Sequence, residues 1–477
     1  MVFSSVIFLC FFLPVMIAGY YILPRKLSNL FLVLGSLFFY AWGGPEYIFI
    51  MLASIAGNYV FGLLIGRSRD DEGSRSLSIR RVVLIASVLY NLGILFYFKY
   101  FTFILTTIHD ITGKEFYIPE TVLPIGISFY TFQGMSYVID VYRQPSLVQK
   151  NPLNLALYIS MFPQLIAGPI VRYTDIRDRL PASGRRTDAH SFALGIERFI
   201  IGLSKKAILA NSIGEVADRI FSSEVQYLGV MVAWLGAVCY TLQIYYDFSG
   251  YSDMAIGLGK IFGFDFMENF NYPYISTSIR DFWRRWHISL SSWFRDYLYI
   301  PLGGNRKGNV YLNLIIVFIA TGIWHGAAWG FVIWGLWHGL FSLAERFVTN
   351  RAPAFKLPAP VGWLYTMLVV ILGWVLFKLE ELPKALSYIG AMFGIDGEAY
   401  VAFSPRFYLD NRMIVIILAA ILAMIPWKNI LAGRAFIPAF AGKLLMPAKR
   451  ILLVILLLLS MMFVVNSTYN PFIYFRF

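Results

Sequence analysis

Five histidines are the side chains of this sequence best suited to move a proton near neutral pH. Histidine has an unperturbed pKa of about 6.5, so it can take up and return a proton at physiological pH. His325 stands in a stretch without charged side chains, residues 309–344. An ionisable side chain in such an apolar stretch is costly and usually faces a polar cavity or pathway. His325 is therefore a candidate general base. The open alternative is a histidine that bonds a neighbouring helix.

Glycines recur around His325 at steps of four residues. Gly322, Gly326 and Gly330 would line one helix face and let another backbone, or a substrate, come close. The stretch 309–344 is too long for one span of about 20 residues. We expect two helices there, or a helix and a broken helix, that meet near residues 322–328.

His287 lies in a segment dense in aromatic and charged side chains. Ser278 followed by Asp281 resembles a helix capping box. Apolar side chains then recur at steps of three and four and predict one aromatic helix face: Trp283, Trp286, Leu290, Trp293 and Tyr297. Two interpretations stay open, an interfacial amphipathic helix with a belt of tryptophans and the wall of a polar tunnel.

Two carboxylates and the remaining histidines suggest structural roles. Asp247 and Asp253 could hold a cation or act as acid and base, but we expect them to cap helix ends and to pair with arginines of segment 280–295. His338 is expected to be a satisfied histidine between helices. The other two histidines lie in polar connectors and are expected to be solvated: His109 and His190.

The composition places all of these residues in a membrane protein. Of 477 residues, 58% are hydrophobic and 14% are charged, and the mean hydropathy is +0.65. Soluble domains carry about 25% charged residues, so a soluble enzyme, a disordered chain and a collagen-like fibre are excluded. Alternating barrel strands are absent, which predicts helical spans. Cys10 and Cys239 give no disulfide framework or zinc spacing, and no metal site, P-loop or zincin motif is predicted.

Uncharged stretches of membrane-spanning length predict about eleven or twelve membrane segments. Residues 1–24 form the first, and the others are 27–45, 47–66, 82–98, 121–139, 151–171, 225–246, 309–344, 357–377, 413–427 and 451–475. Four prolines interrupt the pattern in 121–171 and favour re-entrant or half-crossing helices there: Pro124, Pro152, Pro163 and Pro169.

Basic residues set the expected orientation. Lys and Arg outnumber Asp and Glu by 40 to 27, which gives a net charge of +13. Arginine and lysine cluster in connectors 67–81, 172–186, 280–307 and 428–450, which are expected to be cytoplasmic. Connector 108–120 has no basic cluster and suits the outside. A bound acidic partner, such as a nucleotide-containing cofactor or an acidic carrier protein, is the alternative explanation of the charge.

Four motifs, in order over most of the chain, make it similar to a known family. They lie at residues 123–133 (Leu-Pro-Ile-Gly-Ile-Ser-Phe-Tyr-Thr-Phe-Gln), 246–255, 281–304 and 324–326 (Trp-His-Gly). The chain resembles the membrane-bound O-acyltransferase family, in the bacterial branch of alginate and peptidoglycan O-acetyltransferases and D-alanyl transferases. The resemblance is strongest to the alginate type, in Asp247–Asp253 and Arg284–Ser291.

The resemblance implies an all-α polytopic fold of about eleven transmembrane helices, with re-entrant and amphipathic helices around a central tunnel. One membrane-embedded domain would cover residues 1–466. His325 matches the family's catalytic histidine and would act as general base or transient acyl acceptor. His287 matches the family's second signature histidine and would orient or protonate the reacting groups. A tunnel and donor face is expected from Asp281, Arg284, Arg285, Trp286, Ser291 and Trp324.

The resemblance also implies the reaction and its setting. Acetyl groups would pass from a cytoplasmic thioester across the bacterial inner membrane to an exported polysaccharide. The donor would be acetyl-CoA or an acyl carrier protein thioester, with no permanently bound cofactor. We expect a periplasmic or extracellular SGNH-type transferase as partner, membrane lipid around the chain and no nucleic acid. A D-alanyl or other acyl payload, or a transporter without acyl chemistry, stays open.

The C-terminal tail, residues 467–477, ends in a run of aromatic residues. It lacks the basic cluster of a cytoplasmic end, so we expect it outside. An aromatic belt at the interface is one interpretation. The other is that Phe472, Tyr474 and Phe477 resemble the acyl-relay tail of the D-alanyl transferase system, with Tyr474 carrying the acyl group and the two phenylalanines seating the tail.

Overall fold

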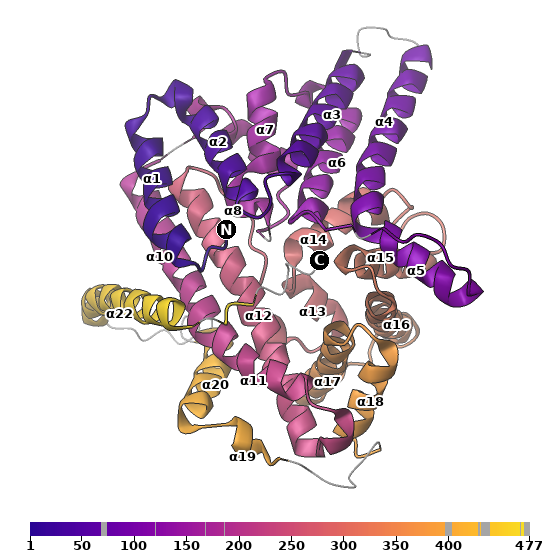
Figure 1. Ribbon diagram of the computed structural model, residues 1–477, viewed down its shortest axis with the longest axis vertical. Coiled ribbons are helices and arrows are strands. Elements are labelled where there is room, and N and C mark those ends of the chain that lie inside the picture. Colours follow the sequence, from indigo (N-terminus) through magenta and orange to yellow (C-terminus); the bar gives the residue numbers. More distant parts are fainter. Residues whose placement is uncertain are drawn as a thin grey trace. The chain divides into compact units, whose positions relative to one another are not determined.

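Helices form every element of secondary structure in the described chain (Figure 1). The computed structural model describes residues 1–67, 74–119, 121–166, 168–185, 187–395, 403–427, 430, 439–467 and 469–471. Within these ranges the predicted all-α class is confirmed. The chain divides into two compact units, the first holding residues 1–196 and 255–267, the second holding 197–254 and the described residues from 268 onward.

The first unit contains the N-terminal helices. They are η1 (Phe8–Phe12), α1 (Leu13–Ile22), η2 (Arg25–Leu27), α2 (Ser28–Ala41), α3 (Tyr47–Arg67), α4 (Ser74–Leu95), η3 (Phe96–Tyr100), α5 (Phe101–Thr112), α6 (Ile127–Arg143), η4 (Pro145–Leu147), α7 (Pro152–Ser160), α8 (Phe162–Leu165), α9 (Tyr173–Ile176), η5 (Arg177–Arg179) and η6 (Ala182–Gly184). The division between the units falls within α10 (Ala189–Ser204) and α12 (Val230–Ile261).

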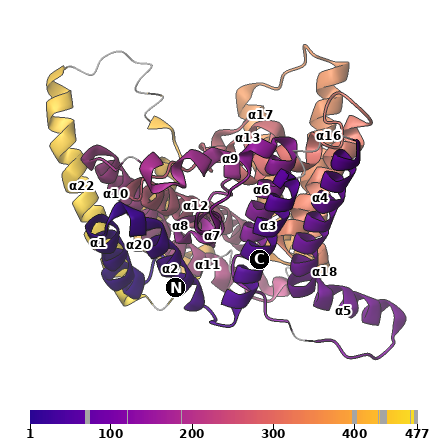
Figure 2. The ribbon, with the colours of Figure 1, turned by 90° about the horizontal axis from the view of Figure 1, so that it is seen from above.

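Three helices of the first unit, α3, α4 and α6, lie side by side (Figure 2). Asn58 of α3 and Asn91 of α4 are fully buried, and each amide donates to the carbonyl oxygen of the other, at 2.9 and 3.0 Å. Inside a membrane the hydrophobic effect does not drive helices together, and hydrogen bonds between polar side chains of neighbouring helices help to join them. This amide pair therefore sets the register of α3 against α4.

Residues 121–171 do not form straight spans. α6 is buried along almost its whole length, and Pro152 and Pro163 stand in the first turns of the short helices α7 and α8. Proline at the first turn of a helix costs no hydrogen bond, but it prevents the preceding helix from continuing. The predicted interruption of this region by proline is confirmed.

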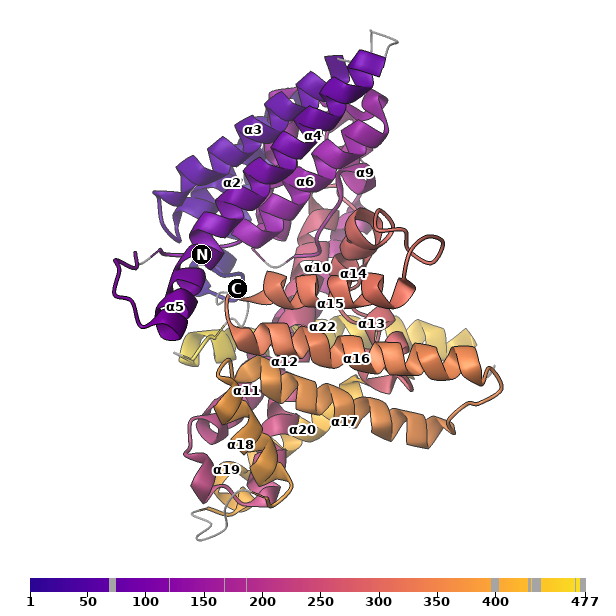
Figure 3. The same cartoon turned by 90° about the vertical axis from the view of Figure 1, so that its right-hand side faces the viewer.

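The second unit carries the remaining helices. They are η7 (Lys205–Ala210), α11 (Asn211–Phe221), η8 (Val225–Tyr227), η9 (Pro273–Ile275), α13 (Ile279–Arg285), α14 (Ile288–Phe294), η10 (Arg295–Tyr299), α15 (Val310–His325), α16 (Trp329–Arg351), α17 (Ala359–Lys378), α18 (Leu382–Met392), α19 (Pro405–Tyr408), α20 (Asn411–Ala423) and α22 (Ala439–Asn466). Helix α16 packs against α15 on one side and against α17 on the other (Figure 3).

The stretch 309–344 forms two helices, as predicted. α15 ends at His325 and α16 begins at Trp329. The three glycines therefore do not share one helix face. A Cβ on Gly322 would lie 2.3 Å from the carbonyl oxygen of Phe331, and one on Gly335 would lie 2.4 Å from that of Phe318. These two glycines let the backbones of α15 and α16 touch, so Gly322 serves helix packing rather than substrate access.

Four helical stretches of the described chain are long and apolar enough to cross a membrane. They are Tyr47–Arg67, Ser76–Thr112, Ala359–Lys378 and Pro447–Asn466. Three shorter apolar helices cover Phe8–Ile22, Val310–His325 and Asn411–Ala423. These helices fit a membrane protein. In the described chain, however, only four helical stretches meet the length and composition of a span, fewer than the eleven or twelve expected.

Candidate active site

The segment that carries His287 forms two short helices. α13 ends at Arg285 and α14 begins at Ile288. Between them His287 has φ 43° and ψ 55°, a left-handed backbone conformation that costs a non-glycine residue on the order of 1–3 kcal/mol. Of the two open interpretations, a single amphipathic helix through this segment is wrong, because the chain turns sharply at His287. Such strained residues concentrate at functional sites.

Asn269 holds this turn from the preceding loop. Its backbone carbonyl accepts from the Ile288 N–H at 3.0 Å, and the Asn271 N–H donates to the Arg285 carbonyl at 2.9 Å. These two bonds attach residues 269–271 to both sides of the turn. They help to hold the strained backbone of His287 in place.

The His287 ring is 1% exposed and lies against Asn269 and Phe248. Its Nδ1 is 3.1 Å from the Asn269 Oδ1, and its ring centroid is 4.6 Å from that of Phe248. Burial lowers the pKa of His287 to about 3. The ring is therefore neutral at physiological pH, which favours an orienting role over proton donation by an imidazolium.

The structure brings the two predicted catalytic histidines together. His325 is the last residue of α15 and is 2% exposed. Its ring centroid lies 6.5 Å from that of His287, and the Trp324 ring lies 6.0 Å from His287. At this separation the two rings are close enough to contact one small group bound beside both of them.

Aromatic rings surround His325 and separate it from His338. His325 lies 5.0 Å from Trp334 and 5.3 Å from Phe377, between ring centroids, and His338 lies 5.2 Å from Trp334 on α16. His338 is fully buried, and among the described residues neither of its ring nitrogens has a hydrogen-bond partner. The expectation that His338 is satisfied by a neighbouring helix is therefore wrong within the described chain.

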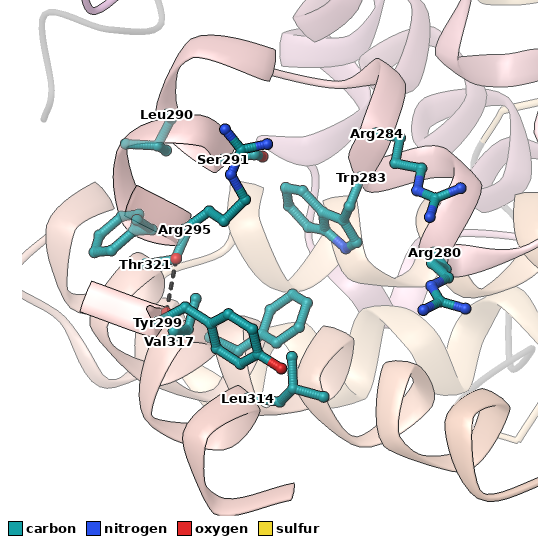
Figure 4. Close-up of a pocket in the computed structure, with 12 residues that line it drawn as sticks. Arg280, Trp283, Arg284, Leu290, Ser291, Arg295, Tyr299, Leu314, Val317 and Thr321 are labelled. Atoms are coloured by element: carbon teal, nitrogen blue, oxygen red, sulfur yellow. Dashed lines mark hydrogen bonds between the residues drawn. The ribbon is translucent and has the colours of Figure 1, made fainter. Parts of the chain in front are cut away.

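A cavity of about 240 Å³ opens beside α13, α14, η10 and α15 (Figure 4). Its wall combines cations and aromatic rings: Arg280, Trp283, Arg284, Leu290, Ser291, Phe294, Arg295, Tyr299, Leu314, Val317, Phe318 and Thr321. In Figure 4, Arg280 and Arg284 lie on one side of Trp283 and Arg295 on the other. Thr321 stands one helical turn before His325 on α15, so the cavity wall leads toward the histidine pair.

The predicted donor face is divided by the structure. Arg284 and Ser291 line the cavity, but Asp281, Arg285 and Trp286 do not, and neither does Trp324, whose ring lies 6.0 Å from that of His287. The Arg285 Nε donates to Asp281 Oδ2 at 2.9 Å, one turn along α13. Trp286 is buried in an aromatic cluster, 4.8 Å from Trp374 between ring centroids. A donor role for these four residues in the cavity is therefore not supported.

The start of α13 is fixed from two sides. Ser278 Oγ accepts from the Asp281 N–H at 3.0 Å, which is the predicted half of a capping box. Glu345 of α16 accepts from the Ile279 and Arg280 N–H groups at 2.6 and 3.0 Å. A carboxylate at a helix N-terminus satisfies free N–H groups and complements the helix dipole. α13 is thereby attached to α16.

The carboxylates of α12 pair with cations other than those predicted. Asp247 binds the Lys206 Nζ at 2.7 Å, and both side chains are buried. Asp253 binds Lys205 and Arg198, each at 2.7 Å. The expected pairing with arginines of 280–295 is wrong, because the π-helical η7 turns two adjacent lysines toward α12.

The C-terminal segment is held by polar contacts as far as the structure describes it. Tyr469 donates to Asp218, Asn211 donates to Asn470, and Lys206 donates to the carbonyl of Pro471. Three consecutive residues are thus each bonded to α11 or η7. The predicted relay residues lie outside the described residues: Phe472, Tyr474 and Phe477.

Sequence patterns alone missed Asn269 and two of the cavity arginines. Asn269 stands in Glu268-Asn-Phe-Asn271, and no spacing rule connects this loop to His287. Arg280 and Arg295 belong to the basic connector that the sequence singles out, but only the fold turns them toward the cavity. The basic composition of segment 280–307 could have pointed to Arg280 and Arg295 as site residues. No sequence pattern pointed to Asn269.

Comparisons with known proteins find one family and several relatives that match most of the chain. The model of the membrane-bound O-acyltransferase family (MBOAT) matches residues 89–379, which include both histidines. A probable alginate O-acetylase AlgI of Azotobacter vinelandii is 45% identical over 399 residues, or 82% of this chain and 78% of that protein. A peptidoglycan O-acetyltransferase of Helicobacter pylori is 38% identical over 431 residues, or 83% and 80%.

A less similar relative is named for the transfer of a different group, D-alanine. A teichoic acid D-alanyltransferase of Bacillus subtilis is 31% identical over 260 residues, or 52% of this chain and 65% of that protein. The chain belongs to the membrane-bound O-acyltransferase family. The resemblance found in the sequence and the predicted enzyme class, an O-acyltransferase, are confirmed.

Proposed function

We propose that this chain moves acetyl groups from a cytoplasmic thioester across the bacterial inner membrane, for O-acetylation of an exported polysaccharide of the alginate type. The observation that carries the proposal is the pair His287 and His325, with ring centroids 6.5 Å apart next to a cationic cavity. The names of the relatives support acetyl over D-alanyl transfer, since the two named O-acetyl relatives match 82% and 83% of this chain and the D-alanyltransferase matches 52%.

The chemistry needs one base and one orienting group. The acceptor hydroxyl oxygen attacks the thioester carbonyl carbon, a C–O bond forms, and the C–S bond breaks. His325 takes the hydroxyl proton and returns it to the departing thiolate, so the base is regenerated. His287, neutral because burial lowers its pKa to about 3, serves as the orienting group.

The cavity supports a donor rich in phosphate. Arg284 is exposed and forms no ion pair within the described residues, and Arg280 lies beside it on α13. Exposed arginines bind phosphate groups in a bidentate manner. Acetyl-CoA, or the phosphopantetheine arm of an acyl carrier protein, fits this chemistry. We place the cavity at the cytoplasmic end of a central tunnel formed by about eleven spans.

A transfer assay tests the proposed function. Purified protein in lipid vesicles is given acetyl-labelled acetyl-CoA, and acetylation of a uronate polymer is measured with its SGNH-type partner present. Label in the polymer supports the proposal. Label transfer only from a D-alanyl carrier thioester would favour the D-alanyl alternative, and no turnover of any thioester would favour a transporter.

Charge reversal in α13 should separate the cavity arginine from the paired one. R284E is expected to raise the KM for acetyl-CoA by roughly three- to tenfold, because it replaces an attraction with a repulsion at an exposed site. R285E is the matched control, since Arg285 pairs with Asp281 and does not line the cavity. Salt should weaken donor binding in the wild type more than in R284E. Equal KM values for the two variants would contradict a donor site here.

We further propose that Tyr474 relays the acetyl group to the external transferase. Its hydroxyl would take the acetyl group as an ester, and Phe472 and Phe477 would seat the tail in the outer mouth of the tunnel. The contacts of Tyr469, Asn470 and Pro471 support the proposal, because they tie the preceding residues to α11 and η7.

Replacing Tyr474 by Phe should remove polymer acetylation and leave donor binding intact. The change removes the hydroxyl that would carry the ester but keeps the aromatic ring. Mass spectrometry of the C-terminal peptide, after incubation with labelled donor, should find one acetyl group in the wild type and none in Y474F. Full polymer acetylation by Y474F would show that the tail is an interfacial anchor.

A further inference from the structure

Asn269 has a side chain whose orientation the surrounding hydrogen bonds determine. Its Oδ1 accepts from the backbone N–H of Ser289 at 3.2 Å and from the Ser289 hydroxyl at 2.9 Å. Its Nδ2 donates to Ser252 Oγ of α12 at 3.0 Å. A backbone N–H can only donate, so the atom that faces it must be the amide oxygen. The flipped amide would place two donors against each other.

The orientation of Asn269 determines the proton position on His287. The same Oδ1 is 3.1 Å from the His287 Nδ1, in a fully buried site. Because a carbonyl oxygen only accepts, Nδ1 must be the ring atom that carries the proton. In a neutral imidazole the other nitrogen, Nε2, then holds the lone pair.

We propose that Asn269 is a positioning residue that holds His287 in its Nδ1–H tautomer, so that Nε2 presents a lone pair and accepts a hydrogen bond from the substrate, while the proton of the reacting hydroxyl goes to His325. The inference rests on the proposed acyl transfer and adds the way in which His287 contributes to it. In the opposite tautomer Nε2 would carry the proton and could only donate a hydrogen bond. Asn269 thus selects whether Nε2 accepts or donates a hydrogen bond.

The backbone of Asn269 serves the same ring. Its carbonyl accepts from the Ile288 N–H, which follows the strained His287, while its side chain binds the imidazole. One residue therefore sets the position of the His287 backbone and the protonation of its ring. The Ser252 Oγ on the far side accepts from the amide NH₂ group, and the Ser289 N–H fixes which way the amide faces.

Nuclear magnetic resonance of the full chain, labelled with ¹⁵N-histidine in detergent or vesicles, tests the inference directly. The chain has five histidines, and H287Q assigns the signals of interest. The wild type is expected to show a protonated Nδ1 and an unprotonated Nε2 at His287. N269D, whose carboxylate can accept the same bonds, should keep this tautomer. In N269A, which lacks the acceptor, both tautomers should be populated.

Kinetics supply the second arm. N269A is expected to lower kcat roughly 10²-fold, the contribution typical of a positioned proton-handling group, with the KM for the donor near wild type. N269D should recover most of the loss. S252A, which removes only the partner of the Asn269 NH₂ group, serves as the structural control and should keep the Nδ1–H tautomer.

An Nε2–H tautomer at His287 in an active wild-type protein would overturn the inference, and so would an unchanged kcat in folded N269A. If N269A does not fold, the wild-type and N269D spectra still decide. A wild-type protein that turns over no thioester would instead overturn the proposed function, whatever tautomer His287 shows.

Discussion

Replacing His325 should abolish acyl transfer while leaving the fold intact. A general base contributes roughly 10²- to 10⁴-fold to the rate, so kcat/KM for transfer should fall by at least that factor in H325A. His325 is buried against Trp334 and Phe377, so alanine also leaves a cavity among aromatic rings. H325Q keeps most of the side-chain volume and should lose the same activity with a Tm in detergent near that of the wild type.

The controls for this result come from the other histidines. His190 is exposed at the start of α10, and H190A should keep wild-type turnover. H338A should keep measurable turnover but unfold at a lower temperature, because its ring packs between Trp283 and Trp334. Substantial transfer by folded H325Q would remove His325 from the mechanism.

The largest effect on stability is expected at the buried ion pair of the second unit. K206M leaves the Asp247 carboxylate in a site where both side chains are almost completely buried. Removing one partner of such a pair costs about 3–5 kcal/mol. The free energy of unfolding in detergent should fall accordingly, and expression should drop with it.

The double variant K206M/D247L distinguishes a lost ion pair from a lost packing contact. Two apolar side chains of similar volume can replace a buried ion pair at little cost, so the double variant should be more stable than K206M alone. Recovery should stay incomplete, since Lys206 also donates to the carbonyl of Pro471. A K206M protein as stable as the wild type would show that Asp247 is satisfied by other groups.

The sequence predicted the helical class, the break in 309–344 and the residues to test first. Those features are local. An apolar stretch of given length, a proline in a first turn and a histidine among glycines can each be recognised from neighbouring residues. The four ordered motifs added the family, which the comparisons confirm.

Local patterns were misleading where a contact or a backbone break decided the outcome. The aromatic periodicity of 283–297 predicted a single helix, but the bonds from residues 269–271 stabilise a turn at His287. The expected number of spans assumed that each apolar stretch is one long helix. Many stretches instead form short helices, and four reach spanning length in the described chain.

The sequence by itself determined which residues can do chemistry, because residue type fixes pKa range and hydrogen-bonding capacity. Only the tertiary structure decided which of them meet. It placed the rings of His287 and His325 6.5 Å apart, paired Asp247 with Lys206, and put Asn269 behind the His287 ring. Each of these contacts joins residues from different helices or loops, and such partners are set by packing, which no local spacing rule encodes.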